Sequence, residues 1–219
     1  MYIICHMVSS IDGRIDCPMV EQSSGNEYYD VLKSYGDISC INGGKTVNHY
    51  YVKEHFVPQN SEPIGCENVF FANQSDKFFI CVDNKASLKY ESHKLENKYI
   101  LCILSEDASK EYLLFLRKKK ISYICTGKQR PDLKKAVEIL DKTMNIQKAV
   151  LLGGGKTNGA FLQAGLIDEI SLLIGAGVDA RINQPALFDG LNEDFPVSEF
   201  KLKSCEALDC GTAKLVYIR

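Results

Sequence analysis

Short apolar segments alternate with helical patterns along most of this 219-residue chain, and this alternation limits the folds that it can adopt. Strands are predicted at residues 2–8, 38–41, 78–82, 99–104, 121–125, 149–152 and 170–174. Strands that alternate with helices form a mostly parallel sheet with helices on both faces. The sequence therefore predicts the α/β class. Two final segments, 202–207 and 214–218, predict a C-terminal antiparallel hairpin.

Helix signals lie between these segments. Ser24 and Glu27 have the spacing of a capping box, and Gly36 suits the end of the helix that follows. Apolar residues from Leu133 to Met144 recur at helical spacing, and helices are also predicted at 107–118 and 158–164. A polar loop is expected over 57–76. Because no linker divides the chain, one domain over residues 1–219 is expected.

The charges of the chain nearly balance, since 26 Lys and Arg face 28 Asp and Glu for a formal net charge of −2. A nucleic-acid binder needs a basic surplus to neutralise phosphates, so this class is excluded. No apolar run reaches the roughly 18 residues that span a bilayer, and the opening segment lacks a basic lead-in. We therefore expect no membrane contact and no signal peptide.

Nine cysteines, an odd number without any Cys-x-x-Cys pair, match neither a disulfide framework nor a zinc site. Five of them lie inside apolar strand segments, namely Cys5, Cys40, Cys81, Cys102 and Cys125. A cysteine there most often acts as a small buried hydrophobe, with a reactive thiol as the alternative. We expect a cytoplasmic protein without a bound metal.

The tetrapeptide Gly-Gly-Lys-Thr occurs twice, at residues 43–46 and 154–157, each time after a predicted strand. Neither copy is a nucleotide-triphosphatase loop, because Ser39 and Val150 stand where that motif needs its first glycine. The dinucleotide pattern Gly-x-Gly-x-x-Gly also fails, since Asn158 replaces its last glycine. A glycine turn before a helix still exposes N–H groups beside about half a positive charge. Two such turns favour anion binding over mere tight turns.

Two motifs make the sequence recognisable. The segment Ser10–Ile15 resembles the Ser-Leu-Asp-Gly-Lys-Ile motif of the riboflavin-biosynthesis reductases, which form the reductase domain of a bifunctional deaminase–reductase. The segment Leu152–Glu169 is similar to that family's glycine-rich turn, helix and following strand. The resemblance covers essentially the whole chain. It implies a three-layer dihydrofolate-reductase-like fold, NADPH as the hydride donor and a homodimer.

The resemblance also implies roles for individual residues. Val8 and Ser10 would lie beside the nicotinamide, and Asp12 would shape the loop over it, on the substrate side. Thr46 and its neighbour Lys45 belong to the first cofactor turn, and Asn84 stands where a serine contacts the cofactor. The turn that would hold the cofactor phosphates comprises Gly153, Gly154, Gly155, Lys156, Thr157 and Asn158. Asp168 and Glu169 also match the family, and a structural role is favoured for both.

The departures from the family pattern fall on the substrate side. Leu152 replaces a glutamate that contacts the pyrimidine, His6 replaces a common lysine, and Ser34 lies near the place of a phosphate-binding arginine. The chain has no tryptophan, so the family's Trp-Ile-Thr-Ser segment is missing. The motifs of the zinc deaminase partner are absent as well.

A reductase also needs a proton donor. His6 at the first strand is one candidate, because an unperturbed pKa of about 6.5 suits proton transfer, and a satisfied core histidine is the alternative. Asp30 and Glu27 on the first helix are further candidates, against which a solvated helix face is favoured.

Three functions follow from this pattern. The first is an NADPH-dependent reductase of a pyrimidine- or pterin-type molecule, foremost 5-amino-6-(5-phosphoribosylamino)uracil. The second is a dihydrofolate or pteridine reductase. The third is a non-catalytic protein that binds NADP(H).

Overall fold

The computed structural model describes residues 1–16, 26–209 and 211–219. Ser24 of the predicted capping box, together with Cys17 and Cys210, lies outside the described residues. The described chain forms two compact units, one of Met1 with residues 38–149 and one of residues 2–37 with 150–219. Strand β8 (Lys148–Leu151) carries the chain from the first unit to the second. The single domain expected over residues 1–219 stays a prediction.

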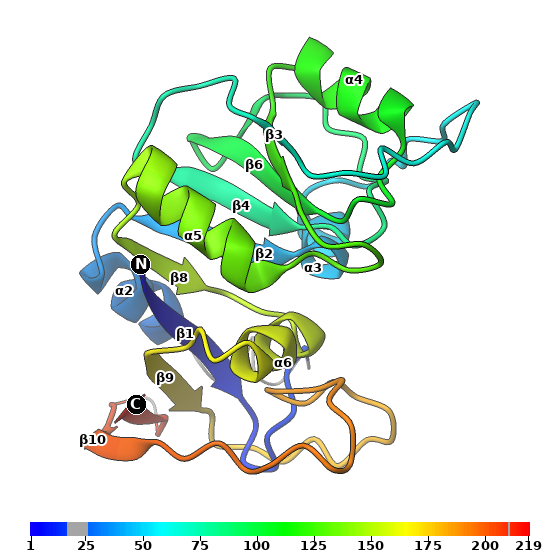
Figure 1. Cartoon of the computed structure of the whole chain (residues 1–219). Coiled ribbons are helices and arrows are strands. Elements are labelled where there is room, and N and C mark those ends of the chain that lie inside the picture. Colours follow the sequence, from blue (N-terminus) through cyan, green and yellow to red (C-terminus); the bar gives the residue numbers. More distant parts are fainter. Residues whose placement is uncertain (17–25, 210) are drawn as a thin grey trace. The chain divides into compact units, whose positions relative to one another are not determined.

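The first unit is built on parallel strands in the order β2, β4, β6 and β7 (Figure 1). Their bounds are Ser39–Gly43, Phe78–Val82, Lys98–Leu104 and Ser122–Cys125. Two short strands run antiparallel to this set: β3 (Asn68–Phe70) pairs with β7, and β5 (Lys94–Leu95) pairs with β6. Nearly every residue of the four parallel strands is buried, as expected for strands covered on both faces.

Three helices belong to the first unit: α3 (Gly44–Tyr50), α4 (Lys110–Lys118) and α5 (Leu133–Met144). The Ser109 hydroxyl accepts from the Tyr112 N–H at the start of α4, and the Asp132 carboxylate accepts from the Lys135 N–H at the start of α5. Asn145, at a left-handed φ of 53°, ends α5. The apolar face predicted for α5 is buried. Because Ser109 caps it, α4 begins at Lys110, three residues after the start predicted at residue 107.

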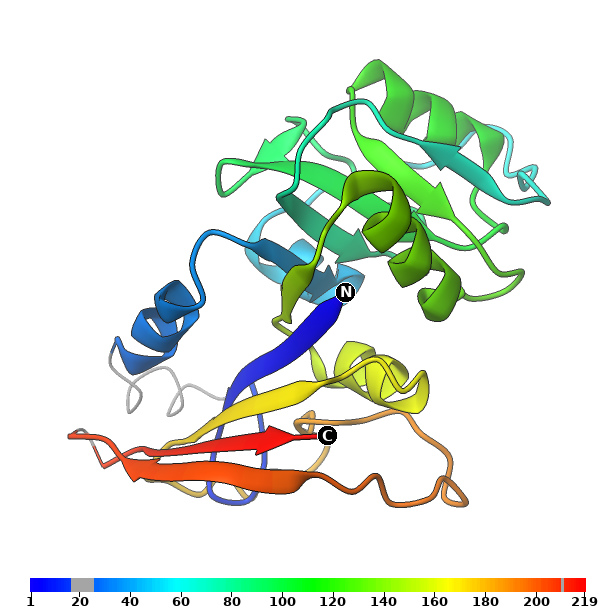
Figure 2. The same cartoon turned by 60° about the vertical axis from the view of Figure 1, so that its left-hand side comes forward.

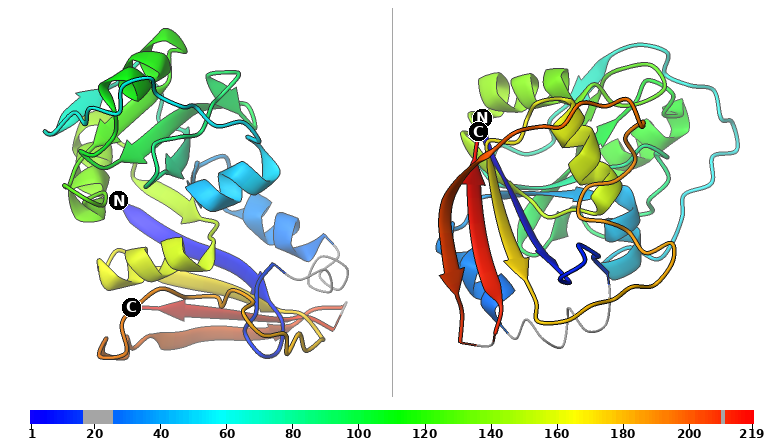
Figure 3. Two further views of the ribbon diagram at one scale, coloured as in Figure 1. Left: turned by 90° about the vertical axis from the view of Figure 1, so that its right-hand side faces the viewer. Right: turned by 90° about the horizontal axis from the view of Figure 1, so that it is seen from below.

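The second unit holds β1 (Tyr2–Ser9), β9 (Glu169–Ile174), β11 (Ala213–Ile218) and β10 (Lys201–Ala207), side by side in that order (Figures 2 and 3). β1 and β9 are parallel, whereas β11 runs antiparallel to both β9 and β10. The predicted C-terminal hairpin is therefore confirmed. All seven residues of β10 are exposed.

The described residues of the second unit include helices α2 and α6. Helix α2 (Glu27–Ser34) has no buried residue, and Gly36 follows it at a φ of +81° as expected for a helix end. Helix α6 (Gly155–Gln163) begins three residues earlier than predicted, inside the glycine turn itself. The parallel strands, their connecting helices and the terminal hairpin confirm the predicted α/β fold. No described helix has both the length and the apolar character that a bilayer span requires.

The polar loop predicted over residues 57–76 is wrong in one part, because it contains strand β3. The backbone of β3 pairs with that of β7, and the Asn68 side chain accepts from the Tyr123 hydroxyl at 2.8 Å. Arg117 lies over the ring of Phe70 at 5.0 Å. These partners come from distant parts of the sequence, so local composition gave no sign of the strand.

Candidate functional site

The second unit contains the glycine turn that follows β8 and opens helix α6. Gly153 has a φ of +90°, and a Cβ there would lie 2.9 Å from the Met7 side chain. The peptide between Gly153 and Gly154 is cis. The N–H groups of Gly155 and Lys156 have no acceptor within the helix, and its first turn carries no acidic residue. This end of α6 can therefore accept an anion.

A strap of five residues, Ala186–Gly190, packs against the start of α6. A Cβ at Gly155 would lie 2.2 Å from the Ala186 carbonyl oxygen, and one at Gly159 would lie 2.1 Å from the Asp189 carbonyl oxygen. The Asp189 N–H donates to the Gly155 carbonyl at 3.0 Å. The backbone of the strap lies so close to α6 that a side chain at position 155 or 159 would clash with it. Glycine is therefore required at both positions.

The buried Asn158 side chain of α6 is hydrogen-bonded to the strap. Its side chain is fully buried, and its Nδ2 donates to the Leu187 carbonyl at 2.8 Å. Its Oδ1 has no partner among the described residues. The sequence predicted that Asn158 contacts the cofactor, whereas its described contacts hold the strap.

The loop after β1, residues 10–16, is hydrogen-bonded to the same region. The Leu187 N–H donates to the Gly13 carbonyl at 3.1 Å, and the Ile15 N–H donates to the Pro185 carbonyl at 3.0 Å. The Gly175 N–H, just beyond β9, donates to the Ser9 carbonyl at 2.9 Å. The glycine turn, the loop after β1 and the long loop after β9 thus form one hydrogen-bonded set within the second unit.

Asp12 is the centre of that loop. Its carboxylate accepts the N–H groups of Asp179 and Ala180, both at 3.0 Å, and the buried Ser10 hydroxyl at 2.6 Å. The Ser10 hydrogen bond and the two backbone hydrogen bonds hold the pKa of the Asp12 carboxyl well below its usual range. These contacts give Asp12 a role in loop structure. Contact of Asp12 with a substrate stays a prediction.

His6 is fully buried and has a partner on each ring nitrogen. Its Nδ1 lies 3.0 Å from the Ser171 hydroxyl, and its Nε2 lies 3.0 Å from the Tyr28 carbonyl. The carbonyl can only accept, so Nε2 carries the proton and Nδ1 accepts from Ser171. The ring also stacks on Tyr28 at 4.6 Å. Burial lowers the pKa of His6 to about 4. This geometry favours the satisfied core histidine over the proton donor.

The carboxylates of α2 differ from each other in their surroundings. Asp30 is exposed and pairs with Lys33 at 3.6 Å, one turn further along the helix. This arrangement favours the solvated helix face over a catalytic role for Asp30. Glu27 is half-buried at the first position of the helix.

The remaining predicted residues of the second unit lie near the end of β1, after β8 and at the start of α6. Val8, near the end of β1, and Leu152, after β8, are half-buried. Lys156 is exposed, and its side chain packs along Gly190 with a closest approach of 3.3 Å to the position of a Cβ there. Thr157 is half-buried, and its N–H donates to the Gly154 carbonyl at 2.8 Å.

The first Gly-Gly-Lys-Thr turn lies in the first unit, at the end of β2. A Cβ at Gly44 would lie 3.2 Å from both the Cα and the Oδ1 of Asp83, so the start of α3 packs closely on the turn after β4. The buried Asp83 carboxylate accepts the N–H groups of Lys85 at 3.1 Å and Ser87 at 3.0 Å. The structure therefore brings together two turns that were both predicted to contact the cofactor.

Within these two turns, Thr46 is half-buried on α3, whereas Lys45 and Asn84 are exposed. The Asp83 carboxylate already lies beside the start of α3, where an anion would bind. Neither α3 nor α6 has an acidic residue in its first turn, and an aspartate packs against the start of each. Asp83 Oδ1 lies 3.2 Å from the position of a Cβ at Gly44, and the Asp189 Cβ lies 3.2 Å from the position of a Cβ at Gly155.

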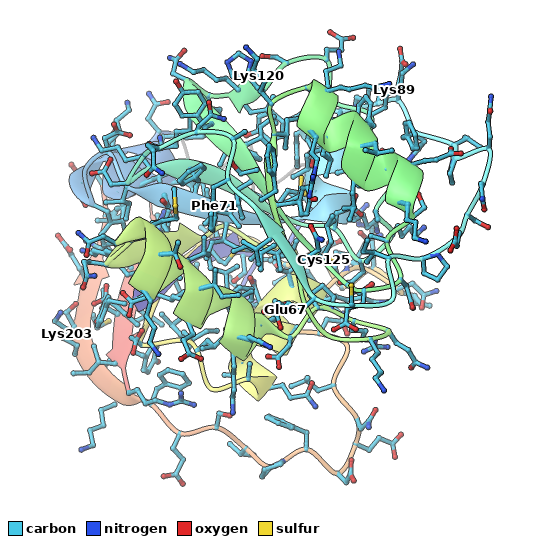
Figure 4. The ribbon with its side chains drawn as sticks, turned by 45° about the horizontal axis from the view of Figure 1, so that its top comes forward. Glu67, Phe71, Lys89, Lys120, Cys125 and Lys203 are labelled. Atoms are coloured by element: carbon cyan, nitrogen blue, oxygen red, sulfur yellow. The ribbon has the colours of Figure 1, made fainter. Side chains whose placement is uncertain are left out.

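Asp168 and Glu169 make the structural contacts expected of them. The Ile3 N–H donates to the Asp168 carboxylate at 2.7 Å, which fixes the beginning of β9 against β1. Glu169 accepts from the Tyr2 hydroxyl at 3.2 Å and pairs with Lys203, labelled in Figure 4, at 3.5 Å.

The described cysteines are free thiols. The five that were expected inside strands are all buried, and burial raises the pKa of the Cys40 thiol to about 12. Cys125, labelled in Figure 4, donates to the Ser105 carbonyl at 2.8 Å. Among the described residues, no three side chains of His, Cys, Asp or Glu are grouped so as to hold a metal ion.

Sequence reasoning missed Asp83 in the first unit and, in the second unit, the strap and its close contact with Gly155 and Gly159. Asp83 directly follows a buried strand, and this position could have indicated a turn-forming carboxylate. Gly155 and Gly159 are four residues apart, so they share one helix face, and this spacing could have indicated a close contact. No local signal showed that residues 186–190 make that contact.

The sequence profile of the RibD C-terminal domain family matches residues 1–214 of the chain. No curated protein gives a significant match. Among solved structures, a pyrimidine reductase-like protein of Corynebacterium diphtheriae has a TM-score of 0.74 at 16% identity, over 99% of this chain and 91% of that one.

Two longer proteins are also similar. Acinetobacter baumannii RibD has a TM-score of 0.69 at 21% identity, over 99% of this chain and 57% of that one. The Thermotoga maritima diaminohydroxyphosphoribosylaminopyrimidine deaminase/5-amino-6-(5-phosphoribosylamino)uracil reductase has a TM-score of 0.61 at 13% identity, over 99% and 56% of the two chains. This chain thus spans a little over half of each, and these likenesses show a shared fold.

The family match confirms the resemblance drawn from the motifs at residues 10–15 and 152–169, and it supports an oxidoreductase of the riboflavin-biosynthesis reductase type. The chain belongs to the RibD C-terminal domain family.

Proposed function

We propose that the protein is an NADPH-dependent reductase that acts on a pyrimidine- or pterin-type small molecule. The observation that carries the proposal is the start of α6, where free N–H groups, Lys156 and a first turn without acidic residues follow the glycine turn. Family membership supplies the reaction class. The family reaction, reduction of 5-amino-6-(5-phosphoribosylamino)uracil, is the reference reaction for this chain.

The residues of the second unit fit a phosphate of the cofactor. The N–H groups of Gly155 and Lys156 have no acceptor within the helix and can donate to an anion, and the Lys156 side chain is exposed. Lys156 has no carboxylate partner among the described residues. The positive φ of Gly153 and the Met7 side chain, which leaves no room for a Cβ there, both require glycine at this position of the turn. We propose that Gly153–Thr157 bind the phosphate oxygens.

The first unit offers a second, separately testable contact. We propose that the Thr46 hydroxyl and the Asn84 amide donate hydrogen bonds to the cofactor, because Gly44 and Asp83 bring their two turns together. The buried Asp83 carboxylate at this turn disfavours a phosphate there. The Thr46 hydroxyl and the Asn84 amide can instead form hydrogen bonds with the sugar or the base of a nucleotide.

Bound NADPH supplies a hydride to an electrophilic carbon of the substrate. The chain orients the ligands and keeps the loop beside them ordered, through Asp12, Ser10 and the strap. Neutral His6 donates its Nε2 proton to the Tyr28 carbonyl and so holds α2 against β1. His6 thus acts on the position of α2 at neutral pH.

Two other functions are distinguished by one experiment. NADPH binding is measured by fluorescence, and NADPH oxidation is then followed with the phosphoribosylaminouracil and with dihydrofolate or a dihydropteridine. Oxidation with the aminouracil supports the proposed function, and oxidation with the pterin alone supports a pteridine reductase. Binding without turnover of either compound supports a non-catalytic NADP(H)-binding protein. Absence of NADPH binding contradicts all three.

We also propose a cytoplasmic homodimer, in line with the family resemblance. Light scattering of the purified protein tests the assembly, and a mass of one chain at working concentration contradicts it.

A further inference from the structure

Strand β10 is the outer strand of the sheet in the second unit (orange in Figure 2). It pairs with β11 on one side, and no described strand pairs with its other side. All seven of its residues are exposed, and its one large apolar side chain, Leu202, is 56% exposed. Ordering a strand costs conformational entropy, which the burial of side chains normally offsets. Within the described chain, β10 receives no such offset.

The free side of β10 carries backbone groups that can form hydrogen bonds. Just beyond the strand, the Leu208 N–H donates to the Thr212 carbonyl at 2.8 Å, and residues 204–207 continue this register with β11 without interruption. Opposed residues of an antiparallel ladder alternate between hydrogen-bonded and non-hydrogen-bonded pairs. The N–H and C=O groups of Cys205 and Ala207 therefore face away from β11. An edge of this kind can pair with a strand of another chain.

The charges along β10 run from basic to acidic. Lys201 and Lys203 lie in its first half, Glu206 lies in its second half, and Asp209 follows just beyond its end. Lys203 and Glu206 also form ion pairs with neighbouring strands of the same chain. A second copy of β10 in antiparallel orientation would bring the partner's Glu206 and the partner's Asp209 toward the two lysines, whereas a parallel copy would bring like charges together. The strand is therefore complementary in charge to an antiparallel copy of itself.

Antiparallel pairing of an edge with itself requires a two-fold axis, the commonest symmetry of protein dimers. An axis beside Cys205 would make Cys205 and the partner's Cys205 a hydrogen-bonded pair, with Cα atoms about 5.5 Å apart. The same axis would set Ser204 opposite the partner's Glu206, where the hydroxyl can donate to the carboxylate. Each copy would cover the free edge of the other, so the assembly closes at two chains.

We propose that β10 is a dimer interface, in which the β10 strands of two copies pair in antiparallel orientation across a two-fold axis. The inference rests on the homodimer of the proposed function. It goes beyond that function in naming the surface of contact and the orientation of the two copies.

The first test uses the position of Cys205. Cys205 and Cys66 are the exposed cysteines among those described, and Cys66 lies in the first unit. The reduced protein is treated with a short bifunctional maleimide and analysed on a denaturing gel. We expect a covalent dimer of the native chain and of Cys66→Ser, and its loss in Cys205→Ser. A native chain that is not cross-linked overturns the inference, as does a covalent dimer that is undiminished in Cys205→Ser.

The second test changes the free edge without changing the pairing with β11. Ala207→Pro removes an N–H that faces the partner, and an edge strand tolerates proline at such a position. Lys201→Glu reverses one exposed charge. Sedimentation analysis should show that the Kd of the dimer rises at least about tenfold in Ala207→Pro, since two symmetric hydrogen bonds are lost. In Lys201→Glu, it should rise about three- to tenfold.

Lys134→Glu, at an exposed position of α5 in the first unit, is the matched control for charge reversal and should leave the Kd unchanged. A native mass of one chain at working concentration contradicts the homodimer and the interface together, and leaves the proposed reductase activity intact. A native dimer whose Kd is the same in Ala207→Pro and in Lys201→Glu contradicts the interface alone.

Discussion

The Asp12 carboxylate accepts a hydrogen bond from the backbone N–H of Asp179 at 3.0 Å, across 167 residues of sequence. A second hydrogen bond from Ala180 and a third from the Ser10 hydroxyl complete the set. The Asp12 side chain thus adds to the backbone hydrogen bonds that join the loop after β1 to the loop after β9. A carboxylate with three donors orders this part of the second unit.

Replacement of Asp12 by Ala should loosen both loops. We expect faster amide hydrogen exchange at residues 177–187 and weaker NADPH binding, while exchange in the strands of the first unit stays unchanged. Hydrogen exchange with mass spectrometry measures both regions in one experiment. Asp12→Asn keeps one acceptor oxygen and should show a smaller effect. Unchanged exchange at residues 177–187 in Asp12→Ala would show that the loops are held by other contacts.

Gly159→Ala should disrupt the strap. The added Cβ would lie 2.1 Å from the Asp189 carbonyl oxygen, so either the strap or the helix must move. Because overpacking typically costs about 1–3 kcal/mol, we expect a loss of this size in the free energy of unfolding. Chemical denaturation measures it, with Gln163→Ala on an exposed position of the same helix as the control. Equal stability of Gly159→Ala and the native chain contradicts the close contact.

The buried His6 should make the free energy of unfolding depend on pH. Its pKa falls from 6.5 to about 4 on folding, so between these values the unfolded chain binds a proton that the folded chain does not. Stability should therefore rise with pH through this window, by up to about 3 kcal/mol for this group. His6→Gln should flatten the dependence.

The exposed His49 offers a control, because His49→Gln removes a histidine without removing the buried one. The free energy of unfolding is measured for each variant at several values between pH 4 and pH 7. If His6→Gln and the native chain have parallel curves, His6 does not titrate as its burial implies.

Asp83 should be important for the first unit. Asp83→Ala leaves the N–H groups of Lys85 and Ser87 without their acceptor, which should lower the free energy of unfolding by about 1–3 kcal/mol. Asp83→Asn retains one acceptor and should cost less. Urea denaturation compares the two variants. A larger loss in Asp83→Asn than in Asp83→Ala would contradict the role of the acceptor.

Local signals were sufficient for much of the fold. Strand β4 has the predicted bounds, Phe78–Val82, because its residues are uniformly apolar and polar residues flank it. Helix α5 begins after Asp132, a side chain that caps it directly. In both cases the determinant lies within a few residues of the element.

The start of α6 shows why other parts could not be predicted. Glycine disfavours a helix interior by about 1 kcal/mol relative to alanine, so a helix beginning at Gly155 contradicts local propensity. The contact with the strap requires that glycine, and the strap is 31 residues further along the chain at Ala186. The role of His6 was likewise undecided, because its pKa depends on Tyr28 and Ser171, which only the fold brings to it.

The most direct test of the account is NADPH affinity, measured by fluorescence titration of the native chain, Thr46→Val, Lys156→Ala and Lys134→Ala. Lys134 is an exposed lysine of α5, outside the proposed site, and serves as the control. We predict that Lys156→Ala weakens NADPH binding about tenfold, through the loss of one charge-assisted hydrogen bond, and that Thr46→Val weakens it less. Lys134→Ala should bind as the native chain does. Equal affinity of Lys156→Ala and the native chain would contradict the proposed phosphate site.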